Sequence, residues 1–309
     1  MTDVLISEFM DEAAVAALAK DCEVTFDPTL VEERERLLGL GQGVKALIVR
    51  NRTRVDRELL DRFPDLTAVG RLGVGLDNID LDSCRERGIE VLPATGGNTV
   101  SVAEYVLTGI FMLRRGAYLS TPRVLDGEWP RQALMGHETQ GAVLGLVGFG
   151  GIARDLARRA QYLGLQVMAF DPFVAEDDAA WATVGRVEQL ETLLEKADAV
   201  SLHVPLTEGT RHLIDAAALA RMKAGSVLIN TARGGIVDEA ALAASLSEGH
   251  LGGAMLDVFE NEPLAAGSVL AGVEGLIATP HIAGVTHESN TRISWITIDN
   301  VRRALGVPA

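Results

Sequence analysis

The chain has 309 residues, of which 48% are hydrophobic and 23% charged, the balance of an ordinary globular protein. This composition excludes a disordered or fibrous chain, and at roughly 150 residues per domain the length predicts two domains. The 43 acidic residues outnumber the 28 basic ones and give a formal charge of −15, which repels phosphate backbones and argues against nucleic acid as a partner.

Features that the sequence lacks exclude other partners. No apolar run approaches the ~20 residues needed to span a bilayer, so we expect no membrane segment. The stretch Met1–Glu8 has neither the basic start nor the long apolar run of a signal peptide, which favours a cytoplasmic protein. Cys22 and Cys84 are the only cysteines, and the six histidines show no ligand spacing, so no metal site is expected.

Short apolar runs alternate with helical patterns through the first hundred residues. Strands are predicted at Val4–Phe9, Glu23–Phe26, Ala46–Arg50, Thr67–Arg71 and Ile89–Leu92. Helices are predicted between them at Glu12–Lys20, Glu32–Leu38, Asp56–Arg62 and Leu81–Arg87. This alternation predicts a parallel sheet covered on both faces, and the longer apolar helix Val100–Arg115 leads away from it.

A second series of strands and helices fills the rest of the chain. Strands are predicted at Val143–Val147, Gln166–Phe170, Ala199–Val204, Ser226–Asn230, Gly253–Val258 and Leu276–Ala278. Helices include Ile152–Leu163, Val187–Glu195, Glu239–Leu246 and Ser289–Leu305, the last of which is expected to pack back on the first unit. The pattern predicts two doubly wound α/β domains over a cleft: a discontinuous, flavodoxin-like substrate domain (1–98 plus 286–309) and a Rossmann domain (99–285).

A glycine-rich turn lies where a predicted strand meets a predicted helix. Gly148, Gly150 and Ala153 match G-x-G-x-x-G/A, a pattern that is weak alone but typical of dinucleotide binding in this context. Glycine permits the sharp turn, and the missing side chains let the backbone approach a pyrophosphate at the helix N-terminus. The amides of Gly151 and Ile152 would contact that group.

Asp171 ends the next predicted strand and indicates which dinucleotide binds. A carboxylate here can accept hydrogen bonds from the adenosine ribose hydroxyls and repels the 2′-phosphate of NADP. Pro172 follows it, where an NADP site would favour arginine. We therefore expect NAD(H); the alternative is that Asp171 only caps a helix or shapes a turn.

Three polar clusters follow strands of the second series, at the sheet edge where open α/β folds bind ligands. They are Asn230–Gly235 with Arg233, Leu256–Pro263 with Glu262, and Thr279–Gly284 with His281. Taken one at a time, these can be a surface cation, a loop acid and a histidine with an ordinary packing role. Their joint presence after a dinucleotide motif favours a catalytic set.

Together these motifs resemble the D-isomer-specific 2-hydroxyacid dehydrogenase family, which contains phosphoglycerate, glycerate and D-lactate dehydrogenases. The resemblance covers nearly the whole chain, through Gly73–Asp80, Asn98, Val102–Glu104, the glycine-rich turn, His203–Thr207 and the three clusters. One position departs from the family pattern. Many members have arginine where this chain has Gly151, so a contact to the pyrophosphate is lost unless Arg154 supplies it.

The resemblance implies a reaction and a role for each cluster. His281 would be the general acid and base, and Glu262 would fix its tautomer and stabilise its imidazolium. Arg233 would bind the substrate carboxylate and polarise the carbonyl. Hydride would pass between substrate C2 and nicotinamide C4.

The resemblance also implies further ligand contacts. Asp257 would bind the nicotinamide carboxamide, whereas His203 would only pack beside the cofactor. Other cofactor contacts would come from Pro205, Thr210, Thr231, Ala232 and Gly284. Substrate contacts in the first domain would come from Val74, Gly75 and Asn98.

The first domain carries more arginines than a monoanionic acid requires. Arg50 and Asn51 follow a predicted strand, and Arg71 ends another. Because Arg233 and the loop amides already hold one carboxylate, these residues favour a substrate with a second anionic group, such as sulfolactate, phosphoglycerate or a malate-like acid. The alternative is that Arg50, Arg52 and Arg71 pair with surface acids such as Asp56 or Asp77.

Within the family, Val49–Arg54 and Asn98–Arg115 are most similar to sulfolactate-oxidising members, which makes sulfolactate the preferred substrate. Two other functions stay open: a glycerate- or lactate-type 2-ketoacid reductase, and an NAD-sensing regulator on the same fold. The intact set of Arg233, Glu262 and His281 favours an enzyme. The resemblance also implies a homodimer, with Val100–Leu113 and Tyr118–Met135 as candidate surfaces. A helix buried within its own domain would have the same composition as Val100–Leu113.

Overall fold

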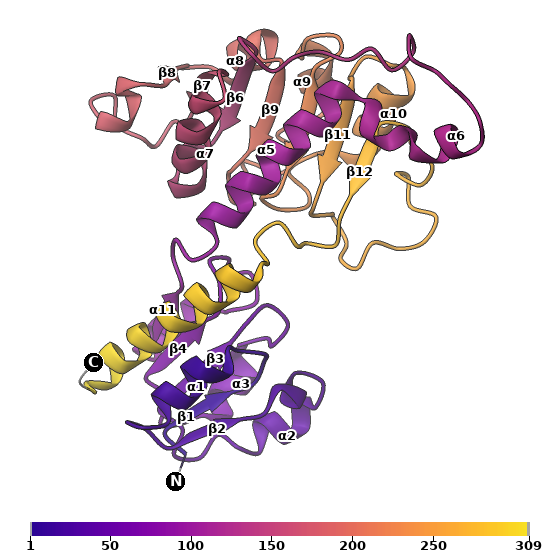
Figure 1. Cartoon of the computed structure of the whole chain (residues 1–309). Coiled ribbons are helices and arrows are strands. Elements are labelled where there is room, and N and C mark those ends of the chain that lie inside the picture. Colours follow the sequence, from indigo (N-terminus) through magenta and orange to yellow (C-terminus); the bar gives the residue numbers. More distant parts are fainter. Residues whose placement is uncertain (1, 308–309) are drawn as a thin grey trace. The chain divides into compact units, whose positions relative to one another are not determined.

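The computed structural model describes residues 2–307, and the chain divides into two compact units (Figure 1). One unit takes Met1–Asn98 together with Val285–Ala309, and the other takes Thr99–Gly284. Each unit is a parallel β-sheet with apolar clusters on both faces. The predicted fold class of two doubly wound α/β domains is confirmed.

The first unit is built on a five-stranded parallel sheet in the order β2-β1-β3-β4-β5, the flavodoxin-like order. Its strands are β1 (Val4–Ile6), β2 (Val24–Phe26), β3 (Ala46–Val49), β4 (Ala68–Arg71) and β5 (Glu90–Pro93). The order reverses between β1 and β3. The loops that follow these two strands therefore lie beside each other at the carboxyl edge, where such folds bind ligands.

Helices cover both faces of this sheet. They are α1 (Glu12–Leu18), η1 (Pro28–Val31), α2 (Arg34–Leu38), α3 (Arg57–Arg62), α4 (Leu81–Glu86) and α11 (His287–Leu305). α11 starts with a capping box between Thr286 and Ser289 and packs on β4. The contact is close, because a Cβ at Gly70 would lie 2.9 Å from Val301 Cγ2.

The second unit is built on a seven-stranded parallel sheet in the order β12-β11-β10-β9-β6-β7-β8. Its strands are β6 (Val143–Val147), β7 (Gln166–Phe170), β8 (Gly185–Arg186), β9 (Ala199–Leu202), β10 (Val227–Asn230), β11 (Gly253–Leu256) and β12 (Leu276–Ala278). This is the Rossmann order with one more strand at the edge, and it reverses between β6 and β9.

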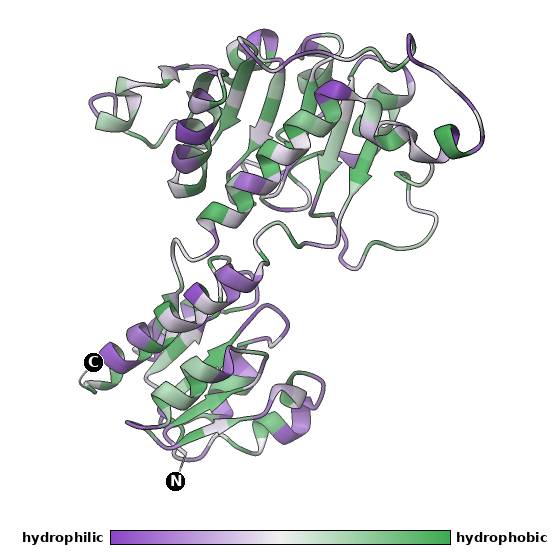
Figure 2. Cartoon of the chain, in the orientation of Figure 1, coloured by the Kyte–Doolittle hydropathy of each residue, from purple (hydrophilic) through white to green (hydrophobic). Residues whose placement is uncertain are grey.

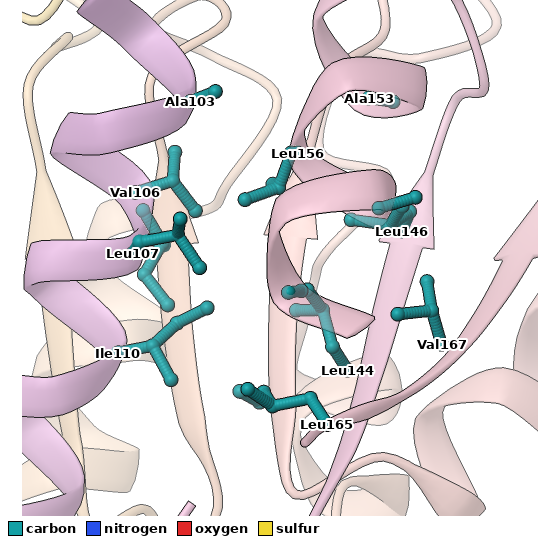
Figure 3. Packing of buried hydrophobic residues seen from close by; sticks show 14 of the residues in the cluster. Ala103, Val106, Leu107, Ile110, Leu144, Leu146, Ala153, Leu156, Leu165 and Val167 are labelled. Atoms are coloured by element: carbon teal, nitrogen blue, oxygen red, sulfur yellow. The ribbon is translucent and has the colours of Figure 1, made fainter. Parts of the chain in front are cut away.

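α5 (Thr99–Arg115) and α7 (Gly151–Tyr162) cover one face of this sheet, and α8 (Leu190–Lys196), α9 (Ala216–Arg221) and α10 (Glu239–Ser247) cover the other. Figure 3 shows Val106 and Ile110 of α5 in the same cluster as Leu156 of α7 and Leu144 of β6. The apolar side chains of Val100–Leu113 are therefore largely buried inside the unit, which was the alternative to a dimer surface for this stretch.

The predicted elements are present, with ends shifted by a few residues, and most strands of both sheets are rich in apolar residues (Figure 2). The helix predicted from Val187 begins at Leu190, and the strand predicted to Val204 ends at Leu202. The two-residue strand β8 and the alanine-rich helix α9 were not predicted, nor were η2 (Ala117–Ser120), α6 (Thr121–Leu125) and η3 (Ala179–Ala182). Among residues 2–307, no helix is both long and apolar enough to cross a membrane.

Candidate active site

The glycine-rich turn after β6 has the geometry of an anion cradle. Gly148 has φ 90°, and a Cβ there would lie 2.7 Å from the His203 carbonyl oxygen. Gly150 is the N-cap of α7 and offers no side-chain cap to the first-turn amides. A Cβ at Gly150 or Gly151 would meet no atom within 4 Å. The turn thus presents open backbone N–H groups at a helix N-terminus, which fits a dinucleotide pyrophosphate.

Arg154, on the first turn of α7, is already occupied by contacts within the protein. Its Nε donates to Phe149 O at 3.0 Å, and its Nη2 donates to Asp178 Oδ2 at 3.0 Å. The guanidinium also lies 5.4 Å from the centroid of the Phe149 ring, which stacks on Trp181. These contacts hold the Arg154 guanidinium against Phe149 and Asp178.

Asp171, directly after β7, closes the same turn. Its Oδ2 accepts the Phe149 N–H and its Oδ1 accepts the Phe173 N–H, both at 2.8 Å. The turn-shaping role that was the alternative from sequence is thus present. Each carboxylate oxygen still has a lone pair, so a contact to ribose hydroxyls is compatible with this geometry.

The loops after β9 and β10 hold the other predicted cofactor residues of the Rossmann unit. Thr210 Oγ1 donates to Pro205 O at 2.6 Å and accepts the Thr207 N–H, which folds this loop into a fixed turn. After β10, Thr231 Oγ1 is buried with no hydrogen-bond partner among the described residues. A buried hydroxyl without a partner is costly, so it fits a bound polar group such as nicotinamide ribose.

Arg233 lies in a turn that Asn230 shapes. The Asn230 side chain is almost fully buried, accepts the Ala232 N–H at 3.0 Å and donates to the Arg233 carbonyl at 2.8 Å. Arg233 Nη1 donates to Ala232 O at 2.5 Å. The sequence pattern that could have indicated this role is an Asn at a strand end, which is typical of such a side-chain-to-backbone turn.

Asp257, directly after β11, holds the turn that carries His281. Its carboxylate is 1% exposed and accepts the Ile282 and Ala283 N–H groups at 2.8 Å and the Thr279 hydroxyl at 2.6 Å. Tyr105 of α5 contacts the same Thr279 hydroxyl. Asp257 therefore supports the turn that carries His281 directly, a role that the sequence does not indicate.

His281 and Glu262 come together as predicted. His281 Nδ1 lies 2.8 Å from Glu262 Oε2, and Glu262 Oε1 accepts the Phe259 N–H at 3.1 Å. An ionised carboxylate only accepts, so Nδ1 carries the hydrogen and Nε2 has a free lone pair when the ring is neutral. The His281 side chain is 44% exposed, and this unshared nitrogen can exchange a proton with a substrate.

His203, after β9, is a different kind of histidine. Burial of its imidazole lowers the pKa of His203 to about 4, and its Nε2 lies 2.9 Å from Ser201 Oγ. It is therefore neutral near pH 7, in keeping with the packing role expected of it.

In the first unit, Glu8 and Asn290 fix the loop after β3. The Glu8 carboxylate is buried and accepts the backbone N–H groups of Arg50 and Thr53 at 2.8 and 2.9 Å. Arg50 Nη2 donates to Asn290 Oδ1 of α11 at 2.7 Å, and its guanidinium forms no ion pair with a carboxylate of residues 2–307. Burial lowers the pKa of the Arg50 guanidinium, and the charge of Glu8 opposes this shift. Neither Glu8 nor Asn290 was predicted, because only the tertiary fold brings them to this loop.

The other arginines and predicted substrate residues of this unit differ in their exposure and in their partners. Arg52 pairs with Glu32 at 2.5 Å, as the surface-acid alternative expected, whereas Asp56 pairs with Arg34 and not with the β3 loop. Arg71 donates to Leu72 O and lies against Gly73. Asn51 and Val74 are exposed, Gly75 is half-buried, and Asn98 Oδ1 is buried without a partner among the described residues.

A Rossmann sheet with this glycine turn, and a His–Glu pair and an arginine after its neighbouring strands, defines a nicotinamide-dependent oxidoreductase. Residues 107–283 match the family model of the D-isomer-specific 2-hydroxyacid dehydrogenase NAD-binding domain. The chain belongs to the D-isomer-specific 2-hydroxyacid dehydrogenase family. It is an NAD-dependent enzyme of that class, as predicted. Within residues 2–307, no group of three or more His, Cys, Asp or Glu side chains is placed to hold a metal.

Relatives in sequence and structure span several substrates. The chain is 84% identical to the (S)-sulfolactate dehydrogenase of Chromohalobacter salexigens over 309 residues, 100% of both chains. It is 36% identical to the D-3-phosphoglycerate dehydrogenase of Archaeoglobus fulgidus over 307 residues, 99% of this chain but 58% of that one. The D-lactate dehydrogenase of Aquifex aeolicus, solved with NAD and lactic acid, has a TM-score of 0.82 and 30% identity, covering 98% of this chain and 95% of that one.

Proposed function

We propose that this protein interconverts (S)-sulfolactate and its 2-keto acid, with NAD as the hydride carrier. The name and 84% identity of the Chromohalobacter salexigens relative support this substrate. The observation that carries the proposal is Arg50, a partly buried cation that is bonded to a neutral Asn290 and forms no ion pair among the described residues. The charge of the buried Glu8 carboxylate offsets only part of the cost of desolvating the guanidinium. A sulfonate would supply an anion in direct contact with it.

The stereochemical label agrees with a D-specific family. In lactate the carboxyl group outranks the methyl group, whereas in sulfolactate the sulfur-bearing carbon outranks the carboxyl group. (S)-Sulfolactate therefore has the spatial arrangement of D-lactate. The same placement of hydride acceptor, base and carboxylate clamp can serve both acids, and only the second anion distinguishes them.

In the proposed mechanism, His281 Nε2 accepts the proton of the substrate 2-hydroxyl as the alcohol is oxidised. Glu262, 2.8 Å from Nδ1, stabilises the imidazolium that forms. Arg233 binds the substrate carboxylate and polarises the C2 oxygen, assisted by the amides of Val74 and Gly75. Bound NAD supplies the hydride acceptor at its nicotinamide ring.

The substrate would also contact Asn51, Arg71 and Asn98 of the first unit. The dinucleotide would be held by open amides and a few polar side chains. Gly148 and Gly150 allow close approach, and the amides of Gly151 and Ile152 face the pyrophosphate. The other contacts proposed are those of Asp171, Pro205, Thr210, Thr231, Ala232, Asp257 and Gly284. The negative charge of Asp171 favours NAD over NADP, which is tested by running the same assay with either dinucleotide.

The substrate proposal is tested by Arg50→Ala. We expect kcat/KM for (S)-sulfolactate to fall roughly 10- to 100-fold, since a hydrogen bond to a charged group contributes ~1.5–3 kcal/mol. For lactate, which has no second anion, kcat/KM should change less than about threefold. Both are measured by NADH absorbance in a panel that also contains phosphoglycerate, malate and glycerate.

Arg52→Ala is the matched control, because Arg52 lies two residues away and is already paired with Glu32. It should leave the preference for sulfolactate unchanged. An equal loss on sulfolactate and lactate in Arg50→Ala would contradict the distal-anion role while leaving the dehydrogenase in place. No turnover of any acid by a wild-type protein that binds NADH would favour the NAD-sensing regulator instead.

Gly151 stands where many family members have arginine, and this difference gives a second prediction. Gly151→Arg should lower the NADH dissociation constant about threefold, the effect of ~0.7 kcal/mol, because an exposed pair between arginine and pyrophosphate contributes at that scale. The substitution fits, since no atom lies within 4 Å of a Cβ at this position. Fluorescence titration with NADH measures it, and Gly151→Ala is the control without charge. Binding no tighter than that of the alanine variant would refute the expectation.

We infer a homodimer from the exposed apolar side chains of the segment that follows α5. Leu125 and Met135 are each 81% exposed, Trp129 is 75% exposed and Tyr118 is 62% exposed. Side chains of this size are usually covered in a stable assembly. Sedimentation of the wild-type protein tests the homodimer.

The cytoplasmic location expected from the sequence stays a prediction.

A further inference from the structure

Two histidines of the second unit share an uncommon backbone conformation, and each contacts a glutamate of the same loop. Among the described residues, only His212 (φ 48°) and His281 (φ 54°) are non-glycine residues with positive φ. Each places a ring nitrogen on a carboxylate of the loop after β11: His281 on Glu262 at 2.8 Å, and His212 on Glu260 at 2.9 Å. A left-handed backbone is costly for histidine, so the surrounding contacts must hold it there.

We infer that His212 and Glu260 form a positioning pair, which fixes the loop carrying Glu262 and thereby the contact between Glu262 and His281. This inference rests on the roles proposed above for His281 and Glu262. It adds two residues that touch neither the substrate nor the reacting atoms in that mechanism. They would act on the reaction only through the orientation of Glu262.

His212 is connected to more than one of the loops that follow the sheet strands. Its backbone N–H donates to Gly235 O at 2.7 Å, in the turn that follows Arg233. Two residues later, Ile214 forms an isolated parallel bridge with Val237. The His212 side chain then reaches Glu260 in the next loop. One residue thus joins the loops after β9, β10 and β11.

The β10 and β11 loops are also packed directly on each other. Gly234 lies against the Phe259 carbonyl so closely that a Cβ there would clash with the backbone. Phe259 in turn donates its N–H to Glu262 Oε1 at 3.1 Å. Movement of the β11 loop would therefore disturb the Arg233 turn and the Glu262 carboxylate together.

Glu260 is held from a second side by Glu239, the first residue of α10. The Glu260 N–H donates to Glu239 Oε1 at 2.7 Å, while its carboxylate accepts from His212. Burial, reinforced by the charges of Glu260 and Asp238, raises the pKa of Glu239. The contact with His212 holds the Glu260 carboxylate, and without it Glu260 would be free to turn away.

The test uses His212→Asn and Glu260→Ala in the full-length enzyme. Asparagine tolerates a left-handed backbone but is too short to reach Glu260, so the fold is kept and the contact is lost. We expect kcat to fall about tenfold in either variant, as for a small displacement of a catalytic group, and the double variant to be no worse than the singles. The NADH dissociation constant should change less than about twofold, and the acid limb of the kcat–pH profile should move.

His250→Asn is the matched structural control. Its Nε2 lies 3.1 and 3.0 Å from the carbonyl oxygens of Leu219 and Met222, away from the β11 loop. It should lower the melting temperature without moving the pH profile. A folded His212→Asn variant with wild-type kcat and pH profile, or with only a lower melting temperature, would overturn the inference. Loss of turnover in His281→Ala in the same experiment would show that the proposed mechanism itself still stands.

Discussion

His281→Ala should lower kcat about 10³-fold, within the range that general acid–base groups contribute. The variant removes the nitrogen that exchanges a proton with the substrate oxygen and leaves Glu262 without its partner at 2.8 Å. Dinucleotide binding should be spared, because the glycine turn after β6 does not involve this side chain. Steady-state turnover of the best acid in the panel and NADH fluorescence titration measure the two effects.

Glu262→Gln tests the stabilising role of Glu262 separately from proton transfer by His281. Glutamine keeps the length and can still accept a hydrogen bond from Nδ1, but it does not balance the charge of an imidazolium. Its kcat should fall less than that of His281→Ala, by about 10- to 100-fold. Retention of full turnover in His281→Ala would refute the mechanism, whatever the behaviour of the glutamine variant.

Arg233→Lys should lower kcat/KM about 100-fold, although the positive charge is kept. Lysine cannot present two parallel donors to a carboxylate, and the shape of the guanidinium is what allows one side chain to bind the carboxylate and polarise the neighbouring oxygen. The turn itself should survive, since Asn230 holds it through the backbone of Ala232 and Arg233. The measurement is kcat/KM in both reaction directions.

The control for this substitution is Arg221→Lys. Arg221 pairs with Glu195 at 3.1 Å on the surface between α8 and α9, and its replacement should leave kcat/KM unchanged. Arg233→Ala with added guanidinium offers a further check, because a small soluble cation can restore part of the lost activity. If Arg233→Lys keeps its kcat/KM for the preferred acid, Arg233 does not clamp the carboxylate.

Local sequence patterns predicted much of the fold and most of the proposed catalytic set. The β-branched runs and intervening amphipathic segments predicted two parallel sheets, since these periods depend only on neighbouring residues. Gly148, Gly150, Arg233, Glu262 and His281 each follow a strand, and parallel strands bring their carboxyl ends to one edge. The sequence therefore predicted these residues as one group before any contact was known.

The tertiary structure decided which of these residues are supported, and by what. Asn290 reaches Arg50 across 240 positions of sequence, Glu8 reaches the same loop across 42, and Tyr105 contacts Thr279 across 174. No local period encodes such pairs, because they arise only when the helices and strands have packed.

The arginines of the first unit also show what the sequence predicts and what only packing decides. From sequence, Arg50 was a candidate for the second anion, and the alternative was that Arg50 and Arg52 both pair with surface acids. In the structure, Arg52 is neutralised by Glu32, while Arg50 is partly buried beside a neutral amide. Sequence by itself determined the family, the sheets and the choice of the proposed catalytic trio, because these depend on residue type and order along the chain. Packing decided which residues hold that trio in place, and it decided that Arg50 stays without an ion pair among the described residues. Burial and pairing exist only in three dimensions, so the sequence alone does not give them.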